Sequence, residues 1–150
     1  MHVGTGAYTD CYAVNFPAAV SLAEFMAAFY TTPVFKLERW LLARALRLPS
    51  TDRDADSLAR GETKRFAAWH VEARESDQAI LAAGRTRSWL MVLPQPSVGG
   101  HATMLLFGSA VLPRRRGGLG WHFTALLGFH KLYSRLLLGA AVRGLARGRT

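Results

Sequence analysis

The chain has 150 residues, of which 50% are apolar or aromatic and 19% are charged. This composition excludes an intrinsically disordered chain and predicts one globular domain over residues 1–150. The formal net charge is +9, and it is unevenly placed. Residues 101–150 carry eight Lys or Arg and no carboxylate, so the basic character belongs to the C-terminal third and needs a local explanation.

The single cysteine, Cys11, excludes an internal disulfide, and no Cys/His spacing typical of a zinc site is present. Because Cys11 stands in an alternating stretch, we expect it to be a small buried side chain. No uncharged run reaches the ~20 apolar residues that span a bilayer. The N-terminus lacks the basic and apolar pattern of a signal peptide. We therefore expect a cytoplasmic protein, with no metal and no cofactor.

The N-terminal segment predicts a strand and then a helix. Residues 8–16 alternate between aromatic or β-branched and smaller side chains, which is typical of a strand. Ser21 and Glu24 have the spacing of a capping box, in which each satisfies a backbone amide of the other at a helix start. We expect this helix over residues 22–30.

Thr32 and Pro33 predict the start of a second helix, as N-cap and first helical residue, and Pro49 closes it. The apolar residues at helical spacing, which are expected to face the core, are Val34, Leu37, Leu41, Ala45 and Leu48. The basic residues, among them Arg39, fall elsewhere on the helical wheel. Residues 52–60 predict a short surface helix.

From residue 63 to residue 113 the pattern changes to a period of two, which predicts four consecutive strands. We expect these strands over residues 66–74, 77–83, 87–93 and 102–112. Pro94, Pro96 and the Gly99-Gly100 pair predict a loop before the last of them. That last strand is apolar on both faces, so we expect it to be central or covered on both sides.

The final segment predicts one long helix over residues 119–146. Its largely apolar half consists of Leu126, Leu127, His130, Tyr133, Ser134, Leu137, Leu138, Ala141 and Leu145. Its other half carries Lys131, Arg135, Arg143 and Arg147. The simpler interpretation is a core helix with a solvated basic face. However, Phe129, Leu132 and Leu136 project among the cations, a mixture that suits docking on an anionic membrane or on a partner protein.

The predicted fold class is α+β, with the order β-α-α-β-β-β-β-α and an antiparallel sheet of about five or more strands packed on the long C-terminal helix. This order resembles the helix-grip fold of the START-like, polyketide-cyclase-like (SRPBCC) superfamily. The segments that resemble uncharacterised bacterial proteins grouped near it are residues 66–72, 85–90, 107–111 and 127–134. The full helix-grip fold has more strands than this sequence shows. The resemblance implies an apolar cavity between sheet and helix and carries no catalytic residue.

The leading hypothesis is therefore that the chain binds a small lipophilic molecule in that cavity. The predicted ligand-binding residues are Trp69, His70, Arg87, Trp89, Met91, Phe107, Trp121, His130 and Tyr133. One alternative is an interaction protein that docks through its basic C-terminal helix on a partner, on a second copy or on an anionic membrane. Another is an enzyme that uses the same pocket with His70 or Tyr133 as its polar group, although we favour binding without catalysis.

Two polar clusters leave alternatives open. His70 and Glu72 are expected to face Arg85 or Arg87 across the sheet, either as a buried polar group or, as we prefer, as a solvated outer face with ion pairs. The triplet Arg114, Arg115 and Arg116 precedes Gly117-Gly118 and suits either an anion site or a solubilising turn. No nucleotide-binding motif is present, and nucleic acid is a disfavoured partner.

Overall fold

The structure is a computed structural model that describes residues 8–97, 100–112 and 121–149. Its elements are β1 (Tyr8–Phe16), α1 (Leu22–Tyr30), α2 (Pro33–Leu46), α3 (Asp52–Ala59), β2 (Arg65–Phe66), β3 (Trp69–Arg74), β4 (Gln78–Ala83), β5 (Thr86–Ser97), β6 (Gly100–Val111) and α4 (Trp121–Arg147). The strands form one antiparallel sheet in the order β1-β6-β5-β4-β3-β2. The predicted α+β class is confirmed, and the predicted order β-α-α-β-β-β-β-α is matched except that the structure adds α3 and β2.

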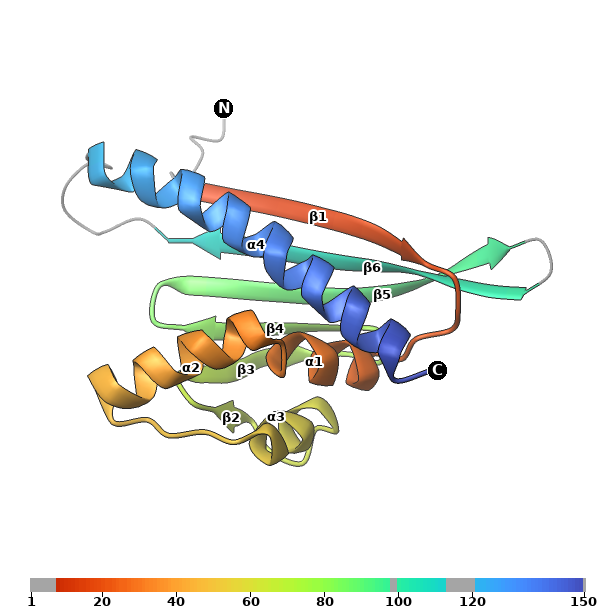
Figure 1. The fold of residues 1–150 in the computed structure, drawn as a ribbon, viewed down its shortest axis with the longest axis horizontal. Coiled ribbons are helices and arrows are strands. Elements are labelled where there is room, and N and C mark those ends of the chain that lie inside the picture. Colours follow the sequence, from red (N-terminus) through yellow and green to blue (C-terminus); the bar gives the residue numbers. More distant parts are fainter. Residues whose placement is uncertain (1–7, 98–99, 113–120, 150) are drawn as a thin grey trace.

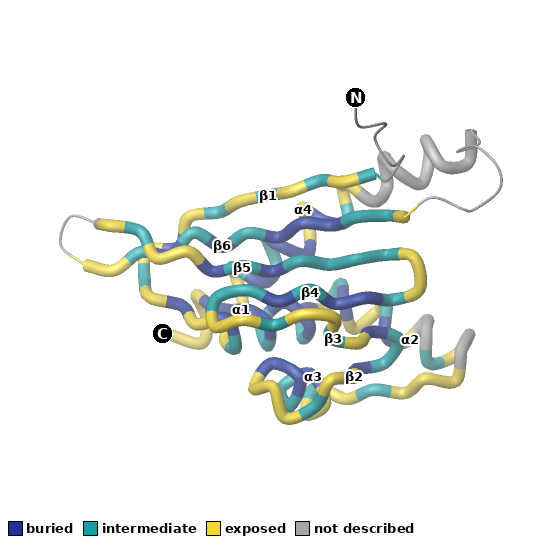
Figure 2. The backbone as a smooth tube through the Cα atoms, turned by 180° about the vertical axis from the view of Figure 1, so that it is seen from behind, coloured by how far each residue is buried: buried dark blue, intermediate teal, exposed yellow. Residues whose placement is uncertain are grey.

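The helices lie on one face of the sheet. Helix α4 crosses the sheet diagonally, and α1 and α2 lie beside it, while α3 lies next to β2 (Figure 1). Seen from behind, the opposite face of the sheet carries no described element (Figure 2). None of the helices in the described ranges combines the length and hydropathy that a bilayer-spanning helix needs.

Helix α1 follows its local signals closely. The Ser21 hydroxyl accepts a hydrogen bond from the Glu24 amide, and the Glu24 carboxylate accepts one from the Ser21 amide, which is the predicted capping box. The predicted range of residues 22–30 is confirmed. Its aromatic residues form the centre of the core, where the Phe29 ring lies 4.7 Å from that of Phe107 and 5.3 Å from that of Tyr30. One face of α1 thereby joins the sheet to α2.

Helix α2 is rotated relative to its predicted orientation. Leu37, which was expected to face the core, is 59% exposed, whereas Arg39 is only 8% exposed. The Arg39 guanidinium donates hydrogen bonds to the side chain and carbonyl oxygens of Ser50 and to Asp52, at 2.8 to 3.1 Å. Its carbon also lies 5.5 Å from the centre of the Phe66 ring. Partners from the following loop thus make a buried arginine more favourable than the helical wheel predicts.

The predicted strand over residues 66–74 is divided into two. Ala67 has a left-handed backbone conformation, with φ at 50°, and it turns the chain between β2 and β3. Such a turn usually contains Gly or Asn, which explains why two alanines gave no turn signal. The division adds the short sixth strand β2.

Strand β5 continues to Ser97, so the predicted loop at Pro94 and Pro96 is wrong. The Val92 amide donates to the carbonyl of Asp77, the residue before β4 begins, so Val92 is the last residue of β5 that has β4 as a neighbour. Backbone nitrogens two residues apart in a strand point to the same edge, so those of Pro94 and Pro96 point to the same edge of β5 as that of Val92. At Pro94 and Pro96 none of the described strands lies on that edge, and β5 pairs only with β6 on the other one. Because neither proline must donate to a neighbouring strand, both fit within β5.

The two faces of the sheet differ in burial. On β1, Tyr12 and Phe16 face α4, whereas Cys11 faces the uncovered side and is exposed. The prediction that Cys11 is buried is therefore wrong, because the helices cover the other face of this edge strand. On β5, Leu90 is fully buried beneath the helices, and Trp89 lies on the uncovered face.

Helix α4 buries the side that its pattern predicts. Ser134, Leu137, Leu138 and Ala141 are at most 2% exposed. Two of its cations lie over aromatic rings of β1: the Lys131 ammonium is 5.9 Å from the centre of the Tyr8 ring, and the Arg135 guanidinium is 5.6 Å from that of Tyr12. Part of the basic face of α4 therefore attaches the helix to the edge of the sheet.

Candidate functional site

A pocket of about 400 Å³ lies where α1, α2 and α4 meet the sheet. Its lining residues are Phe29, Phe35, Glu38, Ala68, Trp69, Ala83, Gly84, Thr86, Ser88, Phe107, Tyr133, Ser134 and Leu137. This volume falls in the range that holds small organic ligands. The pocket occupies the place between sheet and C-terminal helix at which a cavity is expected.

The walls of this pocket are largely aromatic. Phe35 and Trp69 have ring centres 4.9 Å apart, and Phe29 and Phe107 lie 4.7 Å apart. Apart from Trp69, which is 7% exposed, these rings are at most 3% exposed, so the packed core holds them in place. The lining is therefore rigid and apolar over most of its area, as in sites for lipophilic ligands.

One corner of the pocket is polar. The Tyr133 hydroxyl of α4 donates a hydrogen bond to the Glu38 carboxylate of α2. Both side chains are half-buried. Burial raises the pKa of Glu38 above that of an ordinary carboxyl, and the hydrogen bond from Tyr133 partly offsets this. Burial raises the pKa of Tyr133 as well, and the neighbouring charge of Glu38 adds to the effect.

Two buried hydroxyl groups at or near this corner have no hydrogen-bond partner among the described residues. They are the Tyr30 hydroxyl and the Ser134 hydroxyl, and both residues are 0% exposed. Ser134 lines the pocket, and Tyr30 lies close enough to Glu38 for the carboxylate to raise its pKa further. An unpaired buried hydroxyl costs free energy, so a ligand or water that reaches Ser134 would gain a hydrogen bond.

The raised pKa of Glu38 predicts a pH-dependent stability. Below the pKa of a carboxyl in the unfolded chain, Glu38 is protonated in both states. As the pH rises towards the higher pKa that Glu38 has in the folded state, the unfolded chain loses the proton of Glu38 more readily than the native state does. The free energy of unfolding therefore falls. Among the described residues, the other titratable groups that face Glu38 are Tyr133 and Tyr30. Both stay protonated in this range.

We therefore expect Glu38→Gln to remove this loss. The free energy of unfolding by urea should fall for the unaltered protein, relative to the variant, as the pH is raised from about 4 to neutral. Taking the difference between the two proteins cancels carboxyls such as Asp52, whose pKa is lowered and whose contribution has the opposite sign. A difference that stays constant over this range would contradict the raised pKa.

The structure brings three of the predicted ligand-binding residues into the pocket, namely Trp69, Phe107 and Tyr133. It places four others on the uncovered face of the sheet: His70, Arg87, Trp89 and Met91. That face is opposite the pocket, so the expectation that these four line it is corrected. The alternation in β5 shows which residues share a face of the sheet. Because large apolar side chains stand on both faces, the alternation does not show which face the helices cover.

The uncovered face has the arrangement that we preferred for the His70 cluster. The Arg87 guanidinium donates to the Glu72 carboxylate at 2.7 Å, across the sheet, and His70 is exposed. The Trp89 indole nitrogen donates to the Gln78 side chain at 2.9 Å, and its ring lies against Gly108, where an added Cβ would approach it to 2.9 Å. Trp89 therefore packs against Gly108 of β6 and covers that part of the sheet.

The remaining predicted residues lie outside what the structure describes in detail. Trp121 and His130 belong to α4, but their side chains fall outside the described residues, as does the whole of Arg114–Arg116. Among the described residues, no group of three or more His, Cys, Asp or Glu side chains is placed to hold a metal ion. Leu132 and Leu136 are 58% and 47% exposed, and docking through this face of α4 stays a prediction.

Glu38, Ser134, Phe29 and Phe35 line the pocket but were not among the predicted ligand-binding residues. Glu38 gave a weak signal, because it stands three and four residues after Phe35 and Val34 and so lies near the buried side of α2. A single carboxylate at that spacing does not predict a site. Ser134 was assigned to the buried side of the last helix, but the missing partner for its hydroxyl is visible only in three dimensions.

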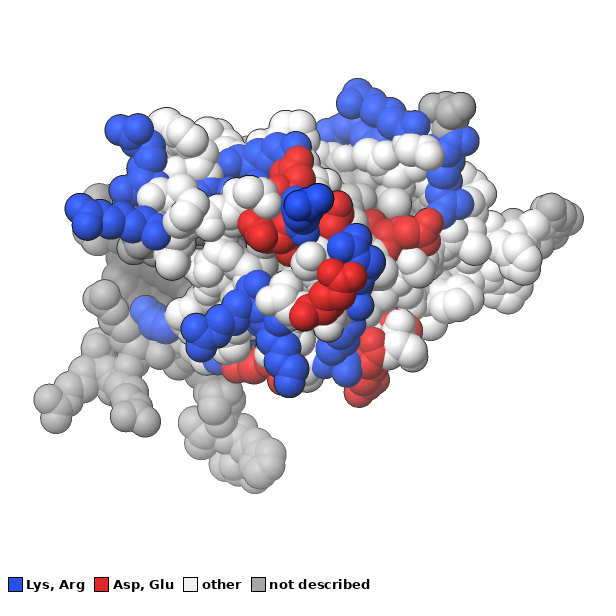
Figure 3. Space-filling model, turned by 90° about the horizontal axis from the view of Figure 1, so that it is seen from below, with Lys and Arg blue, Asp and Glu red and all other residues white. Residues whose placement is uncertain are grey.

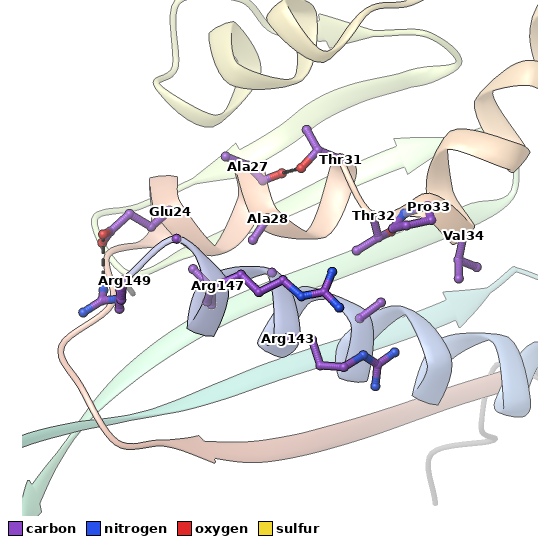
Figure 4. Close-up of a pocket in the computed structure, with 14 residues that line it drawn as sticks. Glu24, Ala27, Ala28, Thr31, Thr32, Pro33, Val34, Arg143, Arg147 and Arg149 are labelled. Carbon is purple, nitrogen blue, oxygen red and sulfur yellow. Dashed lines mark hydrogen bonds and ion pairs between the residues drawn. The ribbon is translucent and has the colours of Figure 1, made fainter.

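A larger hollow, of about 570 Å³, lies between α1, the start of α2 and the end of α4 (Figure 4). Its lining consists mainly of small side chains with Arg143, Arg147 and Arg149 around them, and Arg149 forms an ion pair with Glu24. The first pocket is the better candidate despite its smaller volume, because its lining is aromatic and includes a buried polar atom without a described partner.

The centre of the face seen from the α3 side carries charges of both signs. Figure 3 shows Lys and Arg next to Asp and Glu there, whereas Lys and Arg alone appear at the left edge and at the upper right. Several of these charges form ion pairs, among them Lys36 and Arg39 with Asp52, and Arg60 with Glu62. Mixed, paired charge is typical of a solvated surface.

Comparisons with known proteins do not assign a function. No protein-family model matches the chain, and no curated protein matches it. Among solved structures, an uncharacterised protein from Rhizobium leguminosarum is similar over 95% of this chain and 97% of its own, with 10% sequence identity and a TM-score of 0.37. The antiparallel sheet with a C-terminal helix is established by the structure itself. Membership of the START-like superfamily stays a prediction.

Proposed function

We propose that this protein binds a small lipophilic molecule in the pocket between its sheet and helix α4. The observation that carries the proposal is the pocket itself, with a volume of about 400 Å³ and a largely aromatic lining. Removing a ligand's apolar surface from water supplies about 25 cal/mol per Å². The Glu38–Tyr133 pair and the Ser134 hydroxyl add a polar corner, so a ligand with one polar end and an apolar body matches the site best.

A packed core can also contain aromatic rings without any ligand, so the test must show that a ligand binds in this space. We expect an uncharged fluorescent probe, N-phenyl-1-naphthylamine, to bind with an increase in fluorescence. Ser88 faces the pocket from β5, and the change Ser88→Phe should fill much of it. We expect this variant to bind the probe at least tenfold more weakly, because the added ring occupies the space that the ligand needs.

The matched control is Met91→Phe, three residues along the same strand and on the uncovered face. It adds a phenyl ring of the same kind without changing the pocket, so its probe affinity should match that of the unaltered protein. Circular dichroism would show that both variants keep their secondary structure. Equal loss of binding in both variants, or no loss in either, would place the probe elsewhere on the molecule and contradict the proposal.

A further inference from the structure

The charge of Glu38 is not balanced by any described residue. Although the chain has a net charge of +9, Glu38 forms no ion pair among the residues that the structure describes. The cations closest to it along α2 have other partners: Lys36 pairs with Asp52, and Arg39 with Asp52 and Ser50. In a basic protein, a half-buried carboxylate without a cation is an unusual feature of a pocket wall.

The cations of α4 next to Tyr133 are also directed elsewhere. Lys131 and Arg135 lie over Tyr8 and Tyr12, on the side of the helix that faces β1, whereas Tyr133 faces α2. Within the described lining of the pocket, Glu38 and Tyr133 are the only titratable side chains. The described lining of the pocket therefore offers a negative group and no positive one.

The hydrogen-bonding groups of the corner can serve a donor. A carboxylate has about four acceptor positions, and Tyr133 uses one of those on Glu38. The Ser134 hydroxyl has no described partner and is able to accept as well. An ammonium group carries three donors and one positive charge, so it matches both the acceptors and the missing counter-charge. Phe35 and Trp69 also line the pocket, and the face of an aromatic ring attracts a cation rather than an anion.

From this juxtaposition we infer that the ligand is a lipophilic amine, whose ammonium group binds Glu38 and whose apolar body lies among the aromatic rings. The inference rests on the proposed function and specifies the class of molecule. A fatty carboxylate is disfavoured, because its charge would stand next to that of Glu38. A neutral alcohol can use the same hydrogen bonds but gains nothing from the charge.

Three ligands with the same chain and different polar ends test this inference: octylamine, octanol and octanoate. At neutral pH the amine is protonated, as the lysine side chain is. By isothermal titration calorimetry we expect octylamine to bind at least tenfold more tightly than octanol, and octanoate to bind more weakly than either. In Glu38→Gln, the affinity for octylamine should fall about tenfold or more, while that for octanol should change less than about twofold.

The control is Glu72→Gln, which makes the same change on the uncovered face of the sheet, and it should keep the preference for the amine. Equal affinity for octylamine and octanol, or an amine preference that survives in Glu38→Gln, would overturn the inference. The comparison of the three ligands uses the unaltered protein, so it tests the preference for the amine even if Glu38→Gln fails to fold. Binding of the neutral probe with no preference for the amine would refute only this inference, whereas no binding of any ligand or of the probe would refute the proposed function.

Discussion

Replacing Arg39 by methionine is expected to lower the free energy of unfolding by about 3 kcal/mol. Methionine can fill the apolar space along the arginine stem, so the loss reports mainly on the guanidinium. That group donates to the Ser50 side chain, to the Ser50 carbonyl and to Asp52, and it is almost fully buried. Its removal leaves these acceptors without their donor and loosens the loop that follows α2.

The measurement is urea unfolding followed by circular dichroism, with Lys36→Met as the matched control. Lys36 pairs with the same carboxylate of Asp52 from the same helix, but its side chain is 47% exposed. A surface ion pair of this kind contributes up to about 1 kcal/mol. A loss for Arg39→Met no larger than that for Lys36→Met would contradict the structural role that we assign to the buried arginine.

The second large effect is expected for Phe29→Ala, which should destabilise the protein by about 4 kcal/mol. Phe29 is 1% exposed, and its ring packs on those of Phe25, Tyr30, Phe35 and Phe107. The substitution removes apolar surface and leaves a cavity next to the pocket, and both changes cost stability. The same unfolding experiment measures the loss.

Leu132→Ala is the control for Phe29→Ala, because it also shortens a large apolar side chain, but one that is 58% exposed. We expect it to change stability by less than about 0.5 kcal/mol. A loss for Phe29→Ala of about 1 kcal/mol or less would show that the aromatic cluster is loosely packed. In that case the rings could not provide the rigid pocket wall on which the proposed function depends.

The elements were predictable where a local pattern determines them. The capping box at Ser21 and Glu24 fixed the start of α1, and alternation located β1 and β4 to within a residue. The sequence did not show which face of an element is buried when both faces contain large apolar residues. Thus Trp89 and Met91 were expected in the pocket, but the helices cover the face of β5 that carries Ser88 and Leu90.

The candidate site was predictable only in outline. The resemblance to the helix-grip fold implied a location between the sheet and the last helix, and Trp69, Phe107 and Tyr133 do line the pocket there. Its distinguishing feature, the pairing of Glu38 with Tyr133, joins residues 95 positions apart. No local pattern reports such a pair. The same limit explains Arg39, whose burial depends on Ser50 in the next loop and on Asp52 at the start of α3 rather than on its own helix.

Native mass spectrometry of the purified protein, before and after incubation with octylamine, tests the central claim of a ligand pocket most directly. We predict a lipophilic adduct of defined mass and unit stoichiometry on the unaltered protein and on Met91→Phe, which is lost on denaturation and is absent from Ser88→Phe. The same adduct on all three proteins, or no adduct on the unaltered protein with either octylamine or the neutral probe in excess, would contradict the claim that the space between the sheet and α4 is a binding site.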